Sequence, residues 1–222
     1  MEHFQLTSVQ IVSMWILPIL FAVTIHEVAH GYIADLLGDK TARVLGRLTL
    51  NPVKHIDIFG TIVIPILLLL LNTGIILGWA KPVPVNIHNF KNPRRDMALV
   101  ALAGPMSNFI MALMWATIAK IGSVLLQQDF PGALAIYTMG GAGIAINLML
   151  MVLNLLPIPP LDGSHIVAGV LPRMIALRYE QIAPFGFVIL IVLLYIGAIN
   201  TILSPIIGML YSLIGAVFGL TL

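Results

Sequence analysis

The chain has 222 residues, of which 59% are hydrophobic and only 9% are charged, and its mean hydropathy is +1.04. Soluble domains of this length do not have such a composition, so the sequence predicts an integral membrane protein. The formal net charge of +2 gives no argument for nucleic-acid binding, and the absence of cysteine excludes disulfides, thiolate metal sites and a cysteine nucleophile.

Apolar segments follow one another along the chain with only short polar stretches between them. We expect them at about residues 9–37, 58–79, 97–126, 133–156, 184–199 and 201–222, with a short amphipathic piece at 164–177. The expected fold is an all-α polytopic membrane protein with about five to six transmembrane helices. No long polar insertion separates the segments, so we predict a single membrane domain over residues 1–222.

The first apolar segment contains the pattern His26-Glu27-Val28-Ala29-His30. Residues i and i+4 share one face of a helix, so His26 and His30 can bind one metal ion together. In enzymes with a His-Glu-x-x-His helix, the glutamate acts as the general base. An ionisable side chain at the centre of a membrane helix costs about 2.5–3.5 kcal/mol on insertion scales, so three polar groups here require a partner. A metal ion is the partner we expect.

The basic residues orient the chain, because cytosolic loops carry an excess of lysine and arginine. The loop 38–56 contains four of them and is placed in the cytosol, so the histidine-bearing helix runs inward. A full crossing by the next segment would leave the basic loop 79–96 outside. A turn at 72–74 avoids this, and we therefore predict a re-entrant or extended segment near 57–86. An ordinary transmembrane helix with unusual flanking charge is the alternative.

A third metal ligand follows the fourth apolar segment. Three prolines interrupt the helix in the stretch from Asn154 to Gly163, and Asp162 lies at its end. A catalytic zinc ion takes three protein ligands and keeps a fourth position open, so Asp162 can complete the set with His26 and His30. The re-entrant hairpin leaves two crossings between the histidines and Asp162 and returns it to their side, whereas three full crossings would not.

Five stretches extend this pattern: HEVAHGYIADLLGD at 26–39, GRLTLNPVKHIDIFGT at 46–61, GWAKPVPVN at 78–86, AGPMSNF at 103–109 and NLLPIPPLDG at 154–163. Together they resemble the site-2 protease family of intramembrane zinc metalloproteases, in its compact prokaryotic branch without a PDZ or CBS domain. The resemblance implies that His26, His30 and Asp162 bind one zinc ion and that Glu27 is the general base. It also implies that Asn154 lies near the catalytic centre.

The resemblance further implies regulated intramembrane proteolysis, in which a peptide bond is hydrolysed within or near the transmembrane segment of a membrane protein. The expected partners are a single-span substrate and the lipid bilayer, and we expect no nucleic acid. We expect a multi-pass protein of the cell membrane with its active site near the cytosolic side. The catalytic core is predicted at about 9–167 and the C-terminal helices at about 182–222.

Two alternatives use the same ligands: a membrane metal transporter or sensor, and a non-catalytic homologue that binds membrane helices. Glu27 argues against the second, since binding a metal does not need it, and ligands clustered at one depth argue against transport. The roles of His55 and His165 stay open between a site function and an ordinary interfacial histidine. The segment 78–86 is either a plain connector or an edge to which unwound substrate adds as a strand.

Overall fold

The structure is a computed structural model and describes residues 7–70 and 78–220. These residues form helices and connecting segments without any β-strand. Four helices are long and apolar enough to cross a membrane: α1 (Ser8–Leu36), α4 (Pro93–Leu126), α5 (Ala133–Asn154) and α9 (Ala198–Phe218). A bent pair of helices could provide a fifth. The all-α polytopic membrane fold is therefore confirmed, with four to five spans where five to six are predicted.

The remaining elements are short. They are α2 (Thr41–Val44), η1 (Pro52–His55), η2 (Ile58–Val63), α3 (Ile64–Leu70), η3 (Ile87–Asn89), α6 (Asp162–Val170), α7 (Arg173–Glu180) and α8 (Ala183–Tyr195). Helices α7 and α8 are the bent pair, with 63° between their axes. The prediction of a single domain, with a catalytic core and separate C-terminal helices, stays a prediction.

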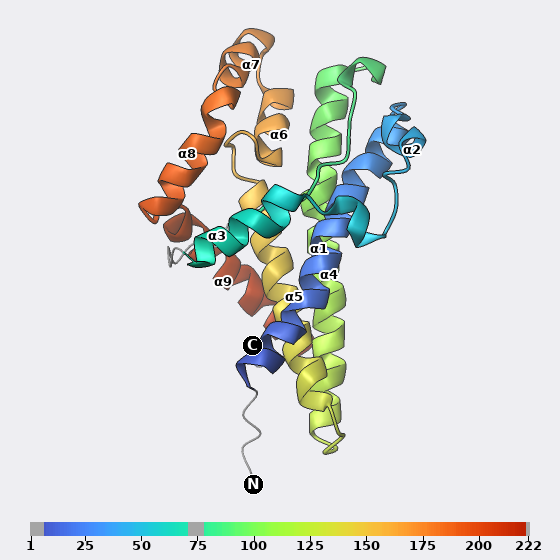
Figure 1. The fold of residues 1–222 in the computed structure, drawn as a ribbon, viewed down its shortest axis with the longest axis vertical. Coiled ribbons are helices and arrows are strands. Elements are labelled where there is room, and N and C mark those ends of the chain that lie inside the picture. The colour runs from blue at the N-terminus through green and yellow to red at the C-terminus, as the bar shows by residue number, and fades with distance from the viewer. Residues whose placement is uncertain (1–6, 71–77, 221–222) are drawn as a thin grey trace.

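Helices α1, α4 and α5 lie side by side along the long axis of the molecule (Figure 1). Helices α4 and α5 approach closely because small residues of α5 face α4: a Cβ on Gly143 would lie 2.2 Å from the Trp115 ring, and one on Gly140 would lie 2.6 Å from the Ala119 backbone. Small residues are how helices pack closely in a bilayer, where no hydrophobic effect drives them together. This packing fixes the end of α5, from which the chain continues to Asp162.

The segment from η2 to residue 86 leaves and returns at the same end of the molecule. Helix α3 crosses beside α1 (Figure 1), and after residues outside the described ranges the chain is back at Trp79. The Trp79 N–H donates to the Gly60 carbonyl at 3.1 Å, and the Thr61 hydroxyl donates to the Trp79 carbonyl at 2.9 Å. A full crossing would separate these residues by the membrane thickness. The structure therefore has the re-entrant arrangement, although the predicted turn at 72–74 lies outside the described residues.

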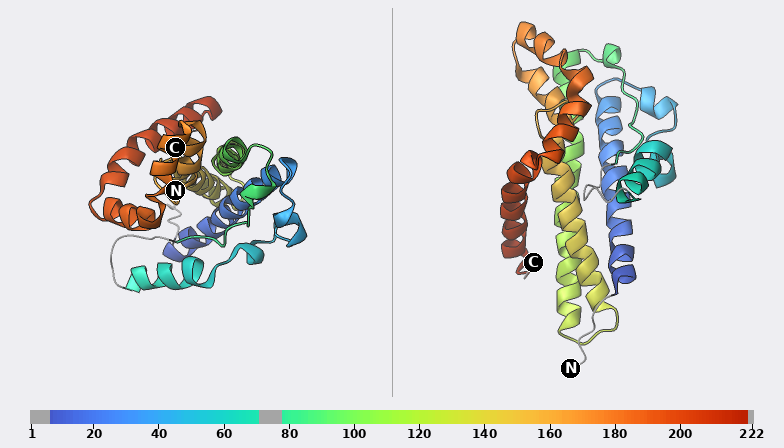
Figure 2. Two further views of the ribbon diagram at one scale, coloured as in Figure 1. Left: turned by 90° about the horizontal axis from the view of Figure 1, so that it is seen from above. Right: turned by 60° about the vertical axis from the view of Figure 1, so that its left-hand side comes forward.

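The C-terminal helices α8 and α9 follow one another in the same overall direction, as the right-hand view of Figure 2 shows. The break between them falls at Gly197, whose φ of +74° is in the left-handed region that favours glycine. Helix α9 packs against α5 and α4, and the Lys120 amine of α4 donates to the Gly219 carbonyl at 3.1 Å, at the end of α9. The pair thus forms one broken path along the bundle.

The close approach of α4 and α5 gives a stability prediction. Replacing Gly140 by alanine puts a methyl group against the backbone of Ala119, which cannot yield as a flexible side chain can, so we expect a loss of about 1–3 kcal/mol in the free energy of unfolding. Unfolding in detergent would measure it. Gly208→Ala is the matched control, because no atom lies within 4 Å of the added Cβ and the helix gains propensity of up to about 1 kcal/mol. Equal effects of the two changes would contradict this account of the packing.

Candidate metal centre

Three side chains from two distant parts of the chain converge where α1, α4 and α6 meet. The Nε2 atoms of His26 and His30, both on α1, lie 3.0 Å apart. Asp162, the first residue of α6, places one carboxylate oxygen 3.2 Å from His26 Nε2 and the other 3.4 Å from His30 Nε2. Among the described His, Asp and Glu residues, these three form the group whose possible ligand atoms all lie within 4.8 Å of one another. The structure thus brings together the three predicted metal ligands.

The hydrogen bonds of the two imidazoles show that the cluster consists of acceptors and lacks a donor. His26 Nδ1 lies 2.5 Å from Asn108 Oδ1, and His30 Nδ1 lies 2.7 Å from the Val100 carbonyl oxygen. Both partners are acceptors, so each Nδ1 carries the proton and each Nε2 presents a lone pair. The two lone pairs and the Asp162 carboxylate then point at one another with no donor between them, and Asp162 Oδ2 is buried without a hydrogen-bond partner. This donor set fits a metal cation such as zinc.

Helix α4 makes room for the imidazoles and holds their partners. A Cβ on Gly104 would lie about 2.5 Å from both histidine rings, so this position must stay glycine for the rings to pack against α4. Asn108 is fully buried and donates from Nδ2 to the Ala22 carbonyl at 3.2 Å and to Asn147 Oδ1 at 2.9 Å. These bonds leave Asn108 Oδ1 aimed at His26, so the amide both orients the ring and fixes its tautomer.

Two features hold Asp162 beside the histidines: a tight turn before it and hydrogen bonds at the far end of α6. The turn before it is tight, because a Cβ on Gly163 would lie 2.3 Å from the Leu155 carbonyl oxygen. At the other end of α6, the Arg94 guanidinium donates to the Ala168 carbonyl at 2.7 Å and also to the Leu171 carbonyl. Arg94 lies in the first turn of α4, so the same helix that orients the histidines also holds α6 in place.

Glu27 is held by the extended segment 78–86. Its Oε2 accepts a hydrogen bond from the Val83 N–H at 2.8 Å, and Val83 is buried. The Lys81 N–H lies on the same edge of the segment as the Val83 N–H and donates to the His55 carbonyl at 2.9 Å. Because the residues at 82 and 84 are prolines without an N–H, the opposite edge has few donors for a paired strand. The hypothesis that unwound substrate adds to this segment as a strand stays a prediction.

Comparisons with known proteins agree with this geometry. The model of peptidase family M50 matches residues 14–138 and 131–194. The chain belongs to this family, the site-2 protease family. It is 38% identical over 198 residues to "Putative zinc metalloprotease YwhC" of Bacillus subtilis, covering 87% of this chain and 85% of the relative. It is 30% identical over 185 residues to Rip2 of Mycolicibacterium smegmatis, which has the same type of name, covering 82% and 66%. No solved structure matches significantly.

Membership of the M50 family makes this chain a membrane zinc metalloprotease, and the remaining predicted residues can be placed in it. Asn154 is the last residue of α5, and its Nδ2 donates to the Leu150 carbonyl at 3.0 Å on its own helix. No described contact joins it to the metal ligands, so its role stays a prediction. His55 is buried and bonds through Nε2 to the Thr49 carbonyl at 2.9 Å, which indicates a structural role. His165 is exposed and lies outside the ligand cluster.

The sequence prediction missed Asn147 on α5, which supports His26 indirectly, through its hydrogen bond with Asn108. Its Oδ1 accepts from Asn108, and its Nδ2 donates to the Gly143 carbonyl at 2.8 Å. A signal was present, because an uncharged polar side chain within an apolar membrane helix costs free energy unless a partner satisfies it. The position of that partner depended on which helices pack together.

A second polar cluster anchors the segment that holds Glu27. The carboxylate of Asp39, just after α1, is fully buried and accepts four hydrogen bonds. The donors are the Thr41 hydroxyl at 2.5 Å, the Thr41 N–H at 3.1 Å, the Asn86 N–H at 2.7 Å and Asn89 Nδ2 at 2.7 Å. The cluster ties the end of α1 to Asn86, the last residue of the extended segment, and to Asn89 just after it, and so holds Val83 near Glu27.

The Asn108 contact gives a prediction about metal affinity. Replacing Asn108 by leucine removes the acceptor for His26 Nδ1, so we expect zinc affinity to fall by roughly 10–100-fold, as for other ligand-orienting groups. Competition with a chromogenic chelator would measure this in detergent. Asn200→Leu, the same change at an exposed position of α9, should leave zinc affinity as in the wild type. Unchanged affinity in a folded Asn108→Leu protein would contradict the orienting role.

The Asp39 cluster gives a prediction about pH. Burial alone would raise the pKa of the Asp39 carboxyl, but the hydrogen bonds from Thr41, Asn86 and Asn89 outweigh it and hold this pKa below its usual range. A lowered pKa in the folded state stabilises the fold above the unfolded value of about 3.9, and this contribution is lost as pH falls through the folded pKa. Asp39→Asn should therefore be less stable than wild type at pH 6, with the difference shrinking in acid. Unfolding measured across this pH range would reject the idea if the difference stayed constant.

Proposed function

We propose that this M50 metalloprotease is an intramembrane endopeptidase that uses one zinc ion to cleave a membrane protein within or near its transmembrane segment. The observation that carries the proposal is the convergence of His26, His30 and Asp162 on a single point between membrane helices, with Glu27 on the same helix as both histidines. A metal site placed between membrane-spanning helices suits a substrate that is itself in the membrane. Donors that meet at one point support one ion.

Zinc at this site would supply Lewis acidity toward the scissile carbonyl and lower the pKa of a bound water. The role we assign to Glu27 is to accept the proton of the attacking water on its carboxylate and to pass it to the leaving amine nitrogen. The Val83 N–H occupies Oε2 and fixes the orientation of the carboxylate, so Oε1 is the oxygen available for the proton. The role proposed for Asn154 is to bind substrate near the metal.

The proposed substrate is a single-span membrane protein, cleaved as a step of regulated intramembrane proteolysis. A membrane helix keeps its carbonyl groups in internal hydrogen bonds, so a substrate must unwind locally before a carbonyl can reach the ligands. Residues with poor helix propensity near the scissile bond would lower the cost of this step. The family assignment supports a protease but leaves the substrate and its regulation to this proposal.

We place the active site near the cytosolic side. His30 lies six residues before the end of α1, or roughly 9 Å along the helix axis. The polar connections that follow α1 and precede α4 lie at this end, and they carry most of the lysine and arginine residues of the chain. An excess of positive charge is the signature of cytosolic loops.

A metal transporter is the second function that the ligands would permit. Transport requires binding groups along a path across the bilayer. Within residues 7–70 and 78–220, the ligand set at α1 and α6 is the group found that could hold a metal ion. Nothing in this arrangement favours transport over hydrolysis.

The deciding experiment compares purified wild type with Glu27→Gln in lipid, using a panel of single-span membrane proteins as substrates. We expect cleavage within the hydrophobic segment by the wild type and a fall of roughly 10²–10⁴-fold in the variant, with zinc content unchanged, because the variant loses a general base and no ligand. Glu180→Gln makes the same change at an exposed carboxylate of α7 and should cleave as wild type. Equal cleavage by Glu27→Gln would refute the role of Glu27 as the base.

A further inference from the structure

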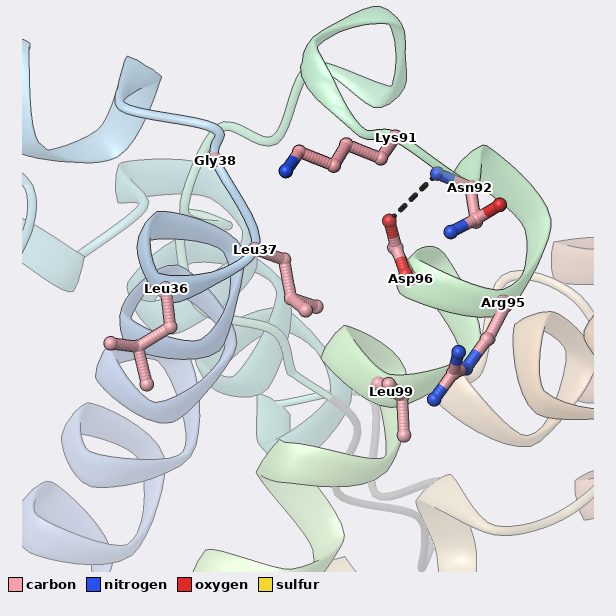
Figure 3. Close-up of a pocket in the computed structure, with 8 residues that line it drawn as sticks. All are labelled: Leu36, Leu37, Gly38, Lys91, Asn92, Arg95, Asp96 and Leu99. Carbon is pink, nitrogen blue, oxygen red and sulfur yellow. Dashed lines mark hydrogen bonds between the residues drawn. The ribbon is translucent and has the colours of Figure 1, made fainter.

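A pocket of about 420 Å³ lies between the end of α1 and the start of α4, apart from the metal centre (Figure 3). Leu36 and Leu37 form its wall on the α1 side, and Lys91, Arg95 and Leu99 form its wall on the α4 side. None of the metal ligands lines it. The pocket is therefore a separate feature, located where two membrane helices meet the basic polar connections.

Two cations line this pocket without a partner. Neither the Lys91 amine nor the Arg95 guanidinium makes a hydrogen bond or ion pair with any described residue. In Figure 3 the Lys91 side chain extends toward Gly38, across the pocket from α4, and the Arg95 side chain extends along α4 toward Leu99. Four other basic residues at this end are engaged through their side chains, namely Lys40, Arg43, Arg47 and Arg94. The side chains of Lys54 and Lys81 are also without a partner among the described residues, but they do not line the pocket.

The one carboxylate in the pocket does not neutralise these cations. Asp96 is only 5% exposed, and its Oδ2 accepts the Asn92 N–H at 2.9 Å at the start of α4. It therefore serves the N-terminus of the helix, where negative charge is favourable. Two free cations against one engaged carboxylate leave the pocket with a net attraction for an anion.

The pocket is also continuous with apolar surface. Leu36 is 63% exposed and Leu99 is 40% exposed, and both belong to helices that can cross a membrane. An occupant must therefore present negative charge to Lys91 and Arg95 and apolar surface to the leucines below them. A soluble anion satisfies the first requirement alone.

We propose that this pocket binds the phosphate head group of an anionic phospholipid, whose acyl chain lies along Leu36 and Leu99. Basic pockets between membrane helices are a known mode of recognising such head groups. A lipid at this position would contact the ends of both α1, which carries the histidines, and α4, which orients them. The proposal is independent of the substrate and of the proteolytic activity.

Native mass spectrometry of the full chain in detergent, titrated with phosphatidylglycerol, would test this. We expect a bound lipid in the wild type and weaker binding of phosphatidylcholine, which has no net charge. Lys91→Gln/Arg95→Gln should weaken phosphatidylglycerol binding by roughly 25-fold, at about fivefold for each basic side chain. The control is Arg173→Gln/Arg178→Gln, which removes two exposed charges from α7 and should bind as wild type.

Three results would overturn the proposal. An equal loss in both double variants would show general attraction to positive charge, and no loss in Lys91→Gln/Arg95→Gln would show that the lipid binds elsewhere. Millimolar inorganic phosphate should not displace the lipid if the leucines contribute. Full displacement by phosphate would assign the pocket to a free anion and would also reject the lipid.

Discussion

Three hydrogen-bond acceptors point at one another among the apolar helices of this protein: two imidazole nitrogens and a carboxylate. Buried acceptors that face one another without a donor are unfavourable, so this arrangement calls for a cation at its centre. The requirement explains why the bonds at the far side of each histidine ring are to acceptors. Each bond commits one nitrogen to carrying the proton and leaves the other free for the metal.

Helix α4 is the scaffold of this arrangement. A backbone carbonyl at Val100, a missing side chain at Gly104 and an amide at Asn108 all act on the two histidines, and Arg94 at its start holds the helix that begins with Asp162. These contacts lie along one side of the helix over about four turns, so one rigid element sets the positions of all three candidate ligands. Rigid support of this kind is what keeps a metal site at its binding geometry.

The re-entrant hairpin links the general base proposed here to the polar end of the molecule. Proline at two positions leaves the extended segment with backbone donors mainly on one edge, and that edge faces Glu27 and the loop of His55. The Asp39 cluster then holds the far end of this segment at Asn86 and the nearby Asn89. A carboxylate oriented by a backbone N–H keeps its position without a second charged group, which would be costly at this depth.

Helix periodicity and composition were sufficient to predict the membrane class, the all-α fold and the pairing of His26 with His30, because these depend on neighbours along the chain. Charge bias and the need for a third ligand were sufficient to predict the hairpin and Asp162, because topology limits which residues reach one depth. Asn147, the Val83 contact to Glu27 and the pocket at Lys91 depended on which helix faces pack together. Only the tertiary structure decides that packing, since in a bilayer it follows from close contacts between small residues rather than from a hydrophobic pattern readable in the sequence.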